Sequence, residues 1–320
     1  MSHNETQLTL IIDEKFDAAD GVAVLRLRSA DGSDLPKWSP GAHIDLLLPS
    51  GMTRQYSLCG DPLDRSMWQI GVLREPAGRG GSQMIHDKLA AGDTIEARGP
   101  RNHFELESSP KYLFIAGGIG ITPIMAMADH AERNGASWSM AYGGRTKASM
   151  AFADELTTHY CDKVALCPQH ETGLLDLDEL LKDIREDTLV YACGPAPLLD
   201  AISERFSKYG WPNGALHVER FTAKQGVEPA SNSSFEVELS LTGMTITVDP
   251  NESILEAVTA CGVRVESSCS QGTCGTCETT VLDGTVDHRD SILTDDEQAA
   301  NDTMMICVSR ASCPRLVLEL

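Results

Sequence analysis

The sequence predicts a multidomain protein in which an antiparallel β-barrel, an α/β domain with a parallel sheet and a small α+β domain follow one another. Three observations predict this order. Residues 1–107 consist of short strands separated by Gly, Pro, Asp and Ser turns. Residues 108–222 alternate apolar strands with helical stretches. Residues 235–320 form a small acidic module, and residues 223–234, which lack periodicity, are expected to be a linker.

In the first domain, six strands at regular spacing predict a closed antiparallel barrel. One helix, residues 82–90, is expected to interrupt the strands, with Ser82 as its N-cap. The expected strands are Leu8–Phe16, Val22–Ser29, Gly41–Leu48, Arg54–Cys59, Trp68–Arg74 and Thr94–Arg98.

In the second domain, the alternation of strands and helices predicts a parallel sheet with helices on both faces. The expected strands are Tyr112–Ala116, Trp138–Tyr142, Lys163–Cys167, Thr188–Cys193 and Ala215–Phe221. The expected helices are Pro123–Asn134, Ala151–His159, Leu177–Ile184 and Pro197–Lys208.

The third domain begins with a predicted hairpin. Apolar residues alternate from Phe235 to Leu241 and again from Met244 to Val248, with Thr242 and Gly243 between them. Ser253 is expected to cap a helix whose apolar face includes Cys261. The cysteines outside the motif described below, Cys59, Cys161, Cys167, Cys261 and Cys313, are expected to be small apolar residues.

The chain is strongly acidic, with 26 Lys and Arg against 47 Asp and Glu and a formal net charge of −21. Such a surface repels phosphate backbones and anionic headgroups, which argues against nucleic-acid and membrane partners. Residues 112–128 are uncharged but contain central glycines and are shorter than the roughly 20 residues of a membrane span. The first ten residues lack a signal-peptide pattern, so we expect a cytoplasmic protein, and we expect a monomer.

The strongest chemical signal is a cysteine motif in the third domain. Cys269, Cys274 and Cys277 have the C-x4-C-x2-C spacing, and Cys307 follows. Four thiolates in this plant-type spacing can hold a 2Fe-2S cluster. The alternative is a structural zinc site, which usually takes two C-x2-C pairs, whereas this sequence has one.

Two runs in the barrel region predict a phosphate-binding site. The first is the strand segment Arg54, Gln55, Tyr56, Ser57 and Leu58, in which Arg54 can supply a cation and Tyr56 an aromatic wall. The second is Gly78-Arg79-Gly80-Gly81-Ser82, which leads into a helix whose N-terminus favours negative charge. Read alone, these glycines also fit an ordinary turn.

One run in the second domain predicts a pyrophosphate site at the carboxyl end of the sheet. It is Gly117-Gly118-Ile119-Gly120-Ile121-Thr122-Pro123, and its alternative is a tight strand-to-helix turn. A second run, Cys193-Gly194-Pro195, closes a later strand of the same sheet and, read alone, is better explained as a buried cysteine before a turn. Arg145, at the end of the next strand, is expected to contact the diphosphate or the ribose. Taken alone, Arg145 and Lys147 favour the 2′-phosphate of NADPH.

Together these motifs resemble the phthalate dioxygenase reductase family, the flavin and ferredoxin reductases that feed Rieske oxygenases and that include vanillate-demethylase-type reductases. The resemblance covers almost the whole chain and implies a β-grasp ferredoxin as the third domain. It implies NADH on the second domain, with Cys193 near the hydride path and Phe221 beside the flavin. It implies FMN, or alternatively FAD, in the barrel, held by Arg54, Tyr56, Ser57, Val72, Leu73, Arg74, Gly80, Gly81 and Ser82.

The three cofactors imply one direction of electron flow. A nicotinamide gives two electrons as hydride, a 2Fe-2S cluster takes one at a time, and a flavin can do both. We therefore expect a reductase that passes electrons from NADH through flavin and cluster to a terminal oxygenase docked on the acidic ferredoxin domain. The alternatives are another acceptor such as a cytochrome P450, a redox sensor without turnover, or a zinc-stabilised binding module.

Overall fold

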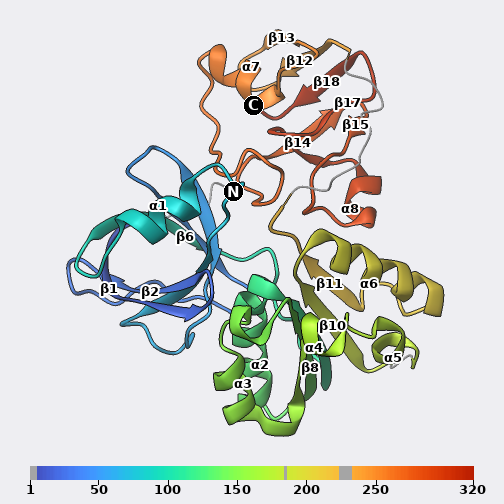
Figure 1. Ribbon diagram of the computed structural model, residues 1–320. Coiled ribbons are helices and arrows are strands. Elements are labelled where there is room, and N and C mark those ends of the chain that lie inside the picture. Colours follow the sequence, from blue (N-terminus) through green and yellow to red (C-terminus); the bar gives the residue numbers. More distant parts are fainter. Residues whose placement is uncertain (1–5, 184–185, 223–232) are drawn as a thin grey trace. The chain divides into compact units, whose positions relative to one another are not determined.

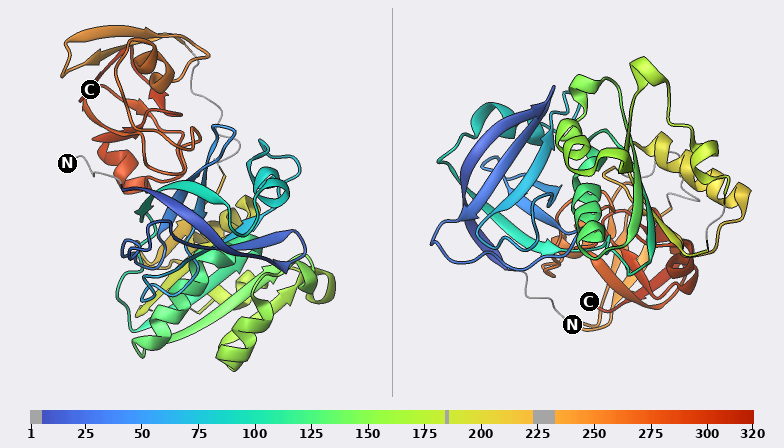
Figure 2. Two further views of the ribbon diagram at one scale, coloured as in Figure 1. Left: turned by 90° about the vertical axis from the view of Figure 1, so that its left-hand side faces the viewer. Right: turned by 90° about the horizontal axis from the view of Figure 1, so that it is seen from below.

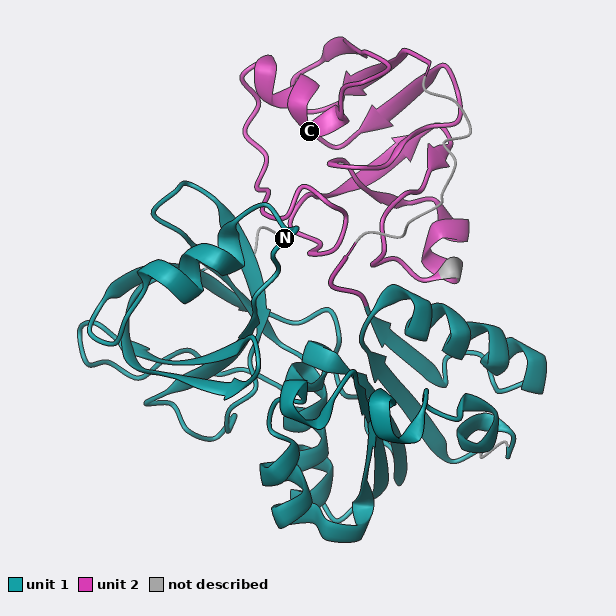
Figure 3. Ribbon diagram, in the orientation of Figure 1, with its two compact units in different colours: residues 1–219 teal, residues 220–320 magenta. Residues whose placement is uncertain are grey.

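The computed structural model describes residues 6–183, 186–222 and 233–320 (Figure 1). The chain divides into two compact units, Met1–Glu219 and Arg220–Leu320 (Figure 3). The expected linker, residues 223–234, falls almost entirely outside the described residues. Within the described ranges, no helix combines the length and the apolar run that crossing a bilayer needs.

The first part of unit 1 is the expected barrel. Its antiparallel sheet has the order β4-β3-β6-β1-β2-β5, and a bridge between Leu58 and Ile70 joins the two outer strands. Fully buried Leu10, Leu25 and Trp68 lie in its core. The strands are β1 (Gln7–Ala19), β2 (Val22–Ser29), β3 (His43–Leu47), β4 (Thr53–Ser57), β5 (Trp68–Leu73) and β6 (Thr94–Arg101).

The barrel helix α1 (Gly81–Lys88) begins one residue earlier than expected, and its N-cap is Gly80. Ser82 as N-cap was therefore wrong. Gly80 has a left-handed φ of 87°, which glycine adopts without the steric cost that a Cβ brings. The Ser82 hydroxyl instead accepts the Glu75 N–H at 3.0 Å. At the other end, the Lys15 ammonium donates to the carbonyls of Ile85, His86 and Leu89.

The second part of unit 1 is the expected parallel sheet, with the order β11-β10-β7-β8-β9. Helices cover both faces of this sheet (Figure 2). Alternate residues of β7 face opposite sides: Phe114 packs under α2 and α3, whereas Leu113 packs under α5 and α6. The strands are β7 (Lys111–Gly117), β8 (Ser137–Gly144), β9 (Val164–Pro168), β10 (Thr188–Cys193) and β11 (Leu216–Glu219). The helices are α2 (Ile121–Arg133), α3 (Ala153–Tyr160), α4 (Gln169–Thr172), α5 (Leu177–Leu181) and α6 (Ala196–Tyr209), with 3-10 turns at Gly118–Gly120, Lys147–Ser149 and Cys161–Lys163.

The barrel and the parallel-sheet part pack directly on each other within unit 1. Val22 and Val24 of the barrel share one apolar cluster with Phe114. The Tyr191 hydroxyl of β10 donates to the Glu105 carbonyl at 3.0 Å and accepts the Glu107 N–H at 2.8 Å. These contacts explain why the two parts form one compact unit.

Unit 2 contains a mixed sheet with the order β13-β12-β18-β14-β16, in which β12 and β18 run parallel. Helix α7 (Ile254–Ala260) has the expected Ser253 cap, completed by Glu256 as a capping box. The strands are β12 (Phe235–Leu239), β13 (Met244–Val248), β14 (Glu278–Asp283), β15 (Val286–Asp287), β16 (Thr303–Met305), β17 (Arg310–Ala311) and β18 (Arg315–Leu318), and a last helix is α8 (Asp295–Ala300).

Two expectations for apolar positions were wrong. Leu241 lies in the turn after β12 and is 74% exposed, because the strand ends at Leu239. Cys161 and Cys261 are exposed, whereas Cys59 is buried as expected. Both exposed cysteines lie at helix ends, where the chain leaves the apolar face.

Candidate cofactor sites

The four motif cysteines of unit 2 are buried together. Cys269, Cys274, Cys277 and Cys307 are between 2% and 8% exposed. Three of them lie on the loop before β14 and the fourth follows β16. Two loop amides, those of Gln271 and Thr273, donate to Cys269 Sγ at 3.2 and 3.4 Å.

The loop reaches this shape through left-handed backbone at three positions. Ser270, Gly272 and Gly275 have φ values of 53°, 66° and 72°. A side chain at Gly272 has no room, because its Cβ would lie 2.5 Å from the Val308 side chain. Gly272 and Gly275 therefore let the backbone wrap so that N–H groups reach a cysteine sulfur.

The cysteine sulfurs contact one another. The Cys269 thiol hydrogen-bonds to Cys274 and Cys307, which holds its pKa well below the usual range, and Cys277 hydrogen-bonds to Cys307. In the described part of the chain, no group of three or more His, Cys, Asp or Glu side chains is placed so that it could hold a single metal ion. Four buried thiols fit a 2Fe-2S cluster, in which cysteines serve two irons rather than one.

The barrel places two cations at the start of α1. Arg54 of β4 lies over Gly81, where a Cβ would come within 2.6 Å of its Nε atom. Burial and the nearby Arg79 lower the pKa of Arg54. The first turn of α1 contains no acidic residue. Two guanidinium groups and a helix N-terminus thus form a cradle that fits a phosphate; Arg54, Arg79 and Gly80–Ser82 are called the phosphate cradle below.

The remaining residues of the β4 motif divide between two faces. Tyr56 lies near Arg54, and burial raises the pKa of its phenol. Gln55 points elsewhere and donates to Asp45 Oδ1 at 3.0 Å. Ser57 is buried, and Leu58 is a fully buried core residue at the barrel closure. The structure therefore brings the Arg54 and Tyr56 side chains together and leaves the Gln55 side chain apart from them.

The end of β5 lies against α1. The Val72 carbonyl is 2.9 Å from His86 Nε2, and Leu73 is part-buried. The Arg74 guanidinium forms two hydrogen bonds to the Asp87 carboxylate, at 2.7 and 3.0 Å. Arg74 thus ties the strand to the helix with its side chain.

The two glycine-containing loops of the parallel sheet touch through their backbones. They follow β7 and β10, which are neighbours. A Cβ at Gly120 would lie 2.3 Å from the Cys193 carbonyl oxygen, and one at Gly117 would lie 2.8 Å from Pro195. A Cβ at Gly194 would lie 3.0 Å from the Gly117 backbone. Gly117, Gly120 and Gly194 are therefore required because the two loops pack closely against each other. Gly118 differs, since it has a φ of 55° and open space around it.

The other residues predicted to bind the dinucleotide do not lie together at one place. They are Thr122, Pro123 and Arg145. Thr122 is 2% exposed and donates to the Ile119 carbonyl at 2.9 Å. Its methyl group lies against Gly71 of the barrel, so Thr122 joins the two parts of unit 1. Pro123 is buried in the first turn of α2. Arg145 is exposed just after β8.

One residue that sequence reasoning missed is Glu219. It ends β11 in register with Cys193 of β10, and its Oε2 atom is 4.0 Å from Cys193 Sγ. Burial raises the pKa of Glu219 to about 8, and burial together with Glu219 raises that of the Cys193 thiol. The sequence feature that could have indicated Glu219 is its position as an acidic residue at the end of a predicted strand. Phe221 follows two residues later, is 39% exposed and belongs to unit 2.

A cavity of about 570 Å³ lies elsewhere in unit 1, between the barrel and α3, and is lined by residues such as Phe16, Gln69 and Phe152. Lys147, which alone would favour NADPH, lines this cavity, whereas the residues predicted to bind the flavin and the pyrophosphate do not.

Comparisons with known proteins agree with this layout. Residues 237–312 match the 2Fe-2S iron-sulfur cluster binding domain, and residues 93–216 match the N-terminal domain of DmmA-like dimethylamine monooxygenase subunits. The phenoxybenzoate dioxygenase subunit beta of Ectopseudomonas oleovorans is 44% identical, over 94% of each chain. The phthalate 4,5-dioxygenase oxygenase reductase subunit of Pseudomonas putida is 38% identical, over 96% of this chain and 94% of that subunit.

Two solved structures are similar over 98% of this chain. Phthalate dioxygenase reductase is 36% identical, with a TM-score of 0.72 and 98% of its own chain covered. An intact type IV self-sufficient cytochrome P450 monooxygenase is 43% identical, with a TM-score of 0.90, but this chain spans only 41% of its length.

Fold, sites and relatives define an iron–sulfur oxidoreductase that uses a flavin and a nicotinamide nucleotide for electron transfer. The chain belongs to the phthalate dioxygenase reductase family.

Proposed function

We propose that this chain is the reductase component of a Rieske-type oxygenase system acting on aromatic compounds. It takes electrons from NADH and passes them through FMN and a 2Fe-2S cluster to the oxygenase. The observation that carries the proposal is the presence in one chain of the phosphate cradle, the paired glycine loops and four buried cysteines. The relatives named as dioxygenase subunits support the acceptor class.

The test is steady-state turnover of the purified protein. With NADH as the electron donor, the purified protein should reduce cytochrome c. It should also reduce the cognate Rieske oxygenase when the two proteins are mixed. An absorption spectrum without flavin and 2Fe-2S bands would refute the proposal and favour a zinc-stabilised binding module. A protein that binds both cofactors but does not turn over NADH would refute it in favour of a redox sensor.

We propose that the flavin is FMN. The phosphate cradle offers two cations and one helix N-terminus, which suit a single terminal phosphate. Tyr56 supplies an aromatic wall next to Arg54. The mass of the cofactor released by heat tests this, since FAD would contradict it.

We propose that the flavin-binding barrel spans residues 1–107 and that the domain of residues 108–222 binds NADH, with the dinucleotide over the loops of Gly117–Pro123 and Cys193–Pro195. Lys147, which alone would welcome a 2′-phosphate, pairs with Asp154 at 3.3 Å. That pairing weakens the case for NADPH, although Arg145 remains exposed. A higher kcat/KM with NADPH than with NADH would refute the preference.

We propose that the oxygenase docks on unit 2. Residues 235–320 contain 15 Asp and Glu against 4 Arg, and the cysteine loop, residues 267–276, contains no charged residue. An uncharged loop inside an acidic rim can approach a partner closely, while the rim attracts a basic surface.

A second acceptor class has a specific observation in its favour. The self-sufficient P450 monooxygenase contains a region similar to this whole chain, at a TM-score of 0.90. A cytochrome P450 is therefore the alternative partner. Reduction rates of a Rieske oxygenase and of a P450 by the same reductase preparation distinguish the two.

A further inference from the structure

A short segment after β15, residues 288–291, connects the two parts of unit 2 that hold the cysteines. The Ser291 N–H donates to the Gly272 carbonyl at 2.9 Å, and Gly272 lies between Cys269 and Cys274. The Arg289 N–H donates to Ser309 Oγ at 3.1 Å, and Ser309 follows Cys307 by two residues. One segment thus touches both cysteine-bearing stretches.

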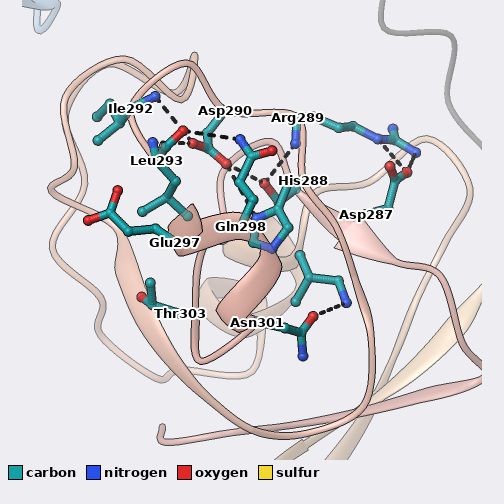
Figure 4. Close-up of polar contacts among 12 residues, drawn as sticks. Asp287, His288, Arg289, Asp290, Ile292, Leu293, Glu297, Gln298, Asn301 and Thr303 are labelled. Atoms are coloured by element: carbon teal, nitrogen blue, oxygen red, sulfur yellow. Dashed lines mark hydrogen bonds and ion pairs between the residues drawn. The ribbon is translucent and has the colours of Figure 1, made fainter. Parts of the chain in front are cut away.

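Asp290 is at the centre of this segment and is only 1% exposed. Its Oδ2 atom accepts the N–H groups of Ile292 and Leu293 at 3.2 and 2.9 Å (Figure 4). Its Oδ1 atom accepts the Ser309 hydroxyl at 3.4 Å. The Ser309 side chain is itself fully buried, so this contact is shielded from water.

Asp290 also fills the space beside the cysteine loop. A Cβ built on Gly272 would lie 3.0 Å from Asp290 Cα and 3.1 Å from its Cβ. The absence of a side chain at Gly272 therefore leaves room for residue 290 to pack against the cysteine loop, and Cα and Cβ of Asp290 make this contact.

A second buried ionisable side chain, His288, lies beside Asp290. The ring of His288, with a side chain 8% exposed, brings Nδ1 to 3.6 Å from Asp290 Oδ1. Neither ring nitrogen of His288 has a hydrogen-bond partner among the described residues. The adjacent Arg289 pairs with Asp287, with Nε at 2.8 Å from Oδ2.

We propose that Asp290 is a positioning residue for the iron–sulfur cluster. Through Gly272 and Ser309 it holds both cysteine-bearing stretches in register, and its buried charge opposes addition of an electron nearby. Net charge and hydrogen bonds around the sulfurs are what set the potentials of such clusters. The inference rests on the proposed function, because it requires the four cysteines to hold a 2Fe-2S cluster.

The main test is Asp290→Asn in the full-length protein. The amide oxygen can still accept the N–H groups of Ile292 and Leu293, and the amide nitrogen can donate to Ser309 Oγ, so the charge is removed while the contacts persist. The matched control is Asp283→Asn, which removes an exposed carboxylate from the same unit. Iron content, the EPR spectrum of the reduced protein and the cluster's reduction potential are measured for all variants.

We expect Asp290→Asn to retain two irons per chain and to shift the equilibrium toward the reduced cluster roughly tenfold, about 59 mV for a one-electron couple. Asp283→Asn should shift it far less, because water screens an exposed charge. A potential and an EPR spectrum equal to those of Asp283→Asn would overturn the proposal.

If Asp290→Asn fails to assemble its cluster, Ser309→Ala tests the positioning role of Asp290 instead. This variant keeps the carboxylate and removes its link to the Cys307 stretch, so we expect an altered EPR line shape with a smaller potential shift. A wild-type spectrum and potential in Ser309→Ala would then overturn the positioning role. Wild-type protein without any 2Fe-2S signal would overturn the cluster assignment and this inference together.

Discussion

The Sγ atom of Cys193 lies 4.0 Å from Oε2 of Glu219, across the neighbouring parallel strands β10 and β11. Burial raises the pKa of Glu219 to about 8, which favours the neutral carboxyl over the carboxylate. The pair lies at the carboxyl end of the sheet, where nucleotides bind in open α/β folds. A neutral carboxyl at this edge avoids placing a negative charge where an anionic dinucleotide is expected.

Glu219→Gln should remove a pH dependence of stability. A folded-state pKa of about 8 exceeds the ordinary value of 4.5, so the folded state binds the proton more tightly. The resulting stabilisation is fully present below about pH 4.5 and is lost as the pH rises through about 8. Urea unfolding across this range should show wild-type stability falling relative to the variant; parallel curves would contradict the pKa shift.

Replacing Cys274 or Cys277 with Ala should abolish the 2Fe-2S absorption and EPR signals. Flavin reduction by NADH should survive, because the phosphate cradle and the glycine loops belong to unit 1 and these cysteines belong to unit 2. Stopped-flow absorption at the flavin band measures the surviving step. Parallel loss of flavin reduction would show that the two units do not function separately, and Cys261→Ala, at an exposed cysteine, is the control.

Arg54→Gln should weaken FMN binding about ten- to hundredfold, since a charge-assisted hydrogen bond contributes roughly 1.5–3 kcal/mol. Riboflavin, which lacks the phosphate, should bind the variant and the wild type equally. Arg28→Gln is the control, because Arg28 is on β2 and pairs with Asp13. Fluorescence titration of the deflavinated protein gives the affinities, and an equal loss for riboflavin would place Arg54 away from the phosphate.

Gly120→Ala should destabilise unit 1 by about 1–3 kcal/mol and raise the KM for NADH. Its Cβ would meet the Cys193 carbonyl at 2.3 Å and push the two loops apart. Gly210→Asn is the control: Gly210 ends α6 in the left-handed region, with φ 72° and ψ 40°, which Asn tolerates, and the space around it is open. Chemical denaturation and NADH kinetics measure both effects; a variant with wild-type values would show that the loops tolerate separation.

Electron transfer to the oxygenase should slow as salt rises, while reduction of the flavin by NADH changes less. The Debye length falls from roughly 10 Å at 0.1 M to about 3 Å at 1 M, which screens attraction between the acidic unit 2 and a basic partner. Stopped-flow rates at several ionic strengths measure both steps. A partner rate that stays constant with an intact cluster would mean that the acidic residues serve solubility alone.

Local features of this protein were predictable because each depends on residues close in sequence. The spacing of Cys269, Cys274 and Cys277 indicates a cluster loop whatever surrounds it. Ser253 and Glu256 form a capping box within one helical turn, as expected. The strands Val22–Ser29 and Thr188–Cys193 were predicted to the residue because apolar periodicity and turn residues mark both ends.

The relationships between distant segments were decided by the tertiary structure. Glu219 meets Cys193 only because β10 and β11 pair in one particular register. Asp290 reaches Gly272 and Ser309 through packing inside unit 2, and nothing in its local sequence separates it from other surface-type aspartates. The burial, the charge environment and the pKa of a side chain depend on which distant segments pack against it. The local sequence predicts the individual helices, strands and loops, but not the contacts between them.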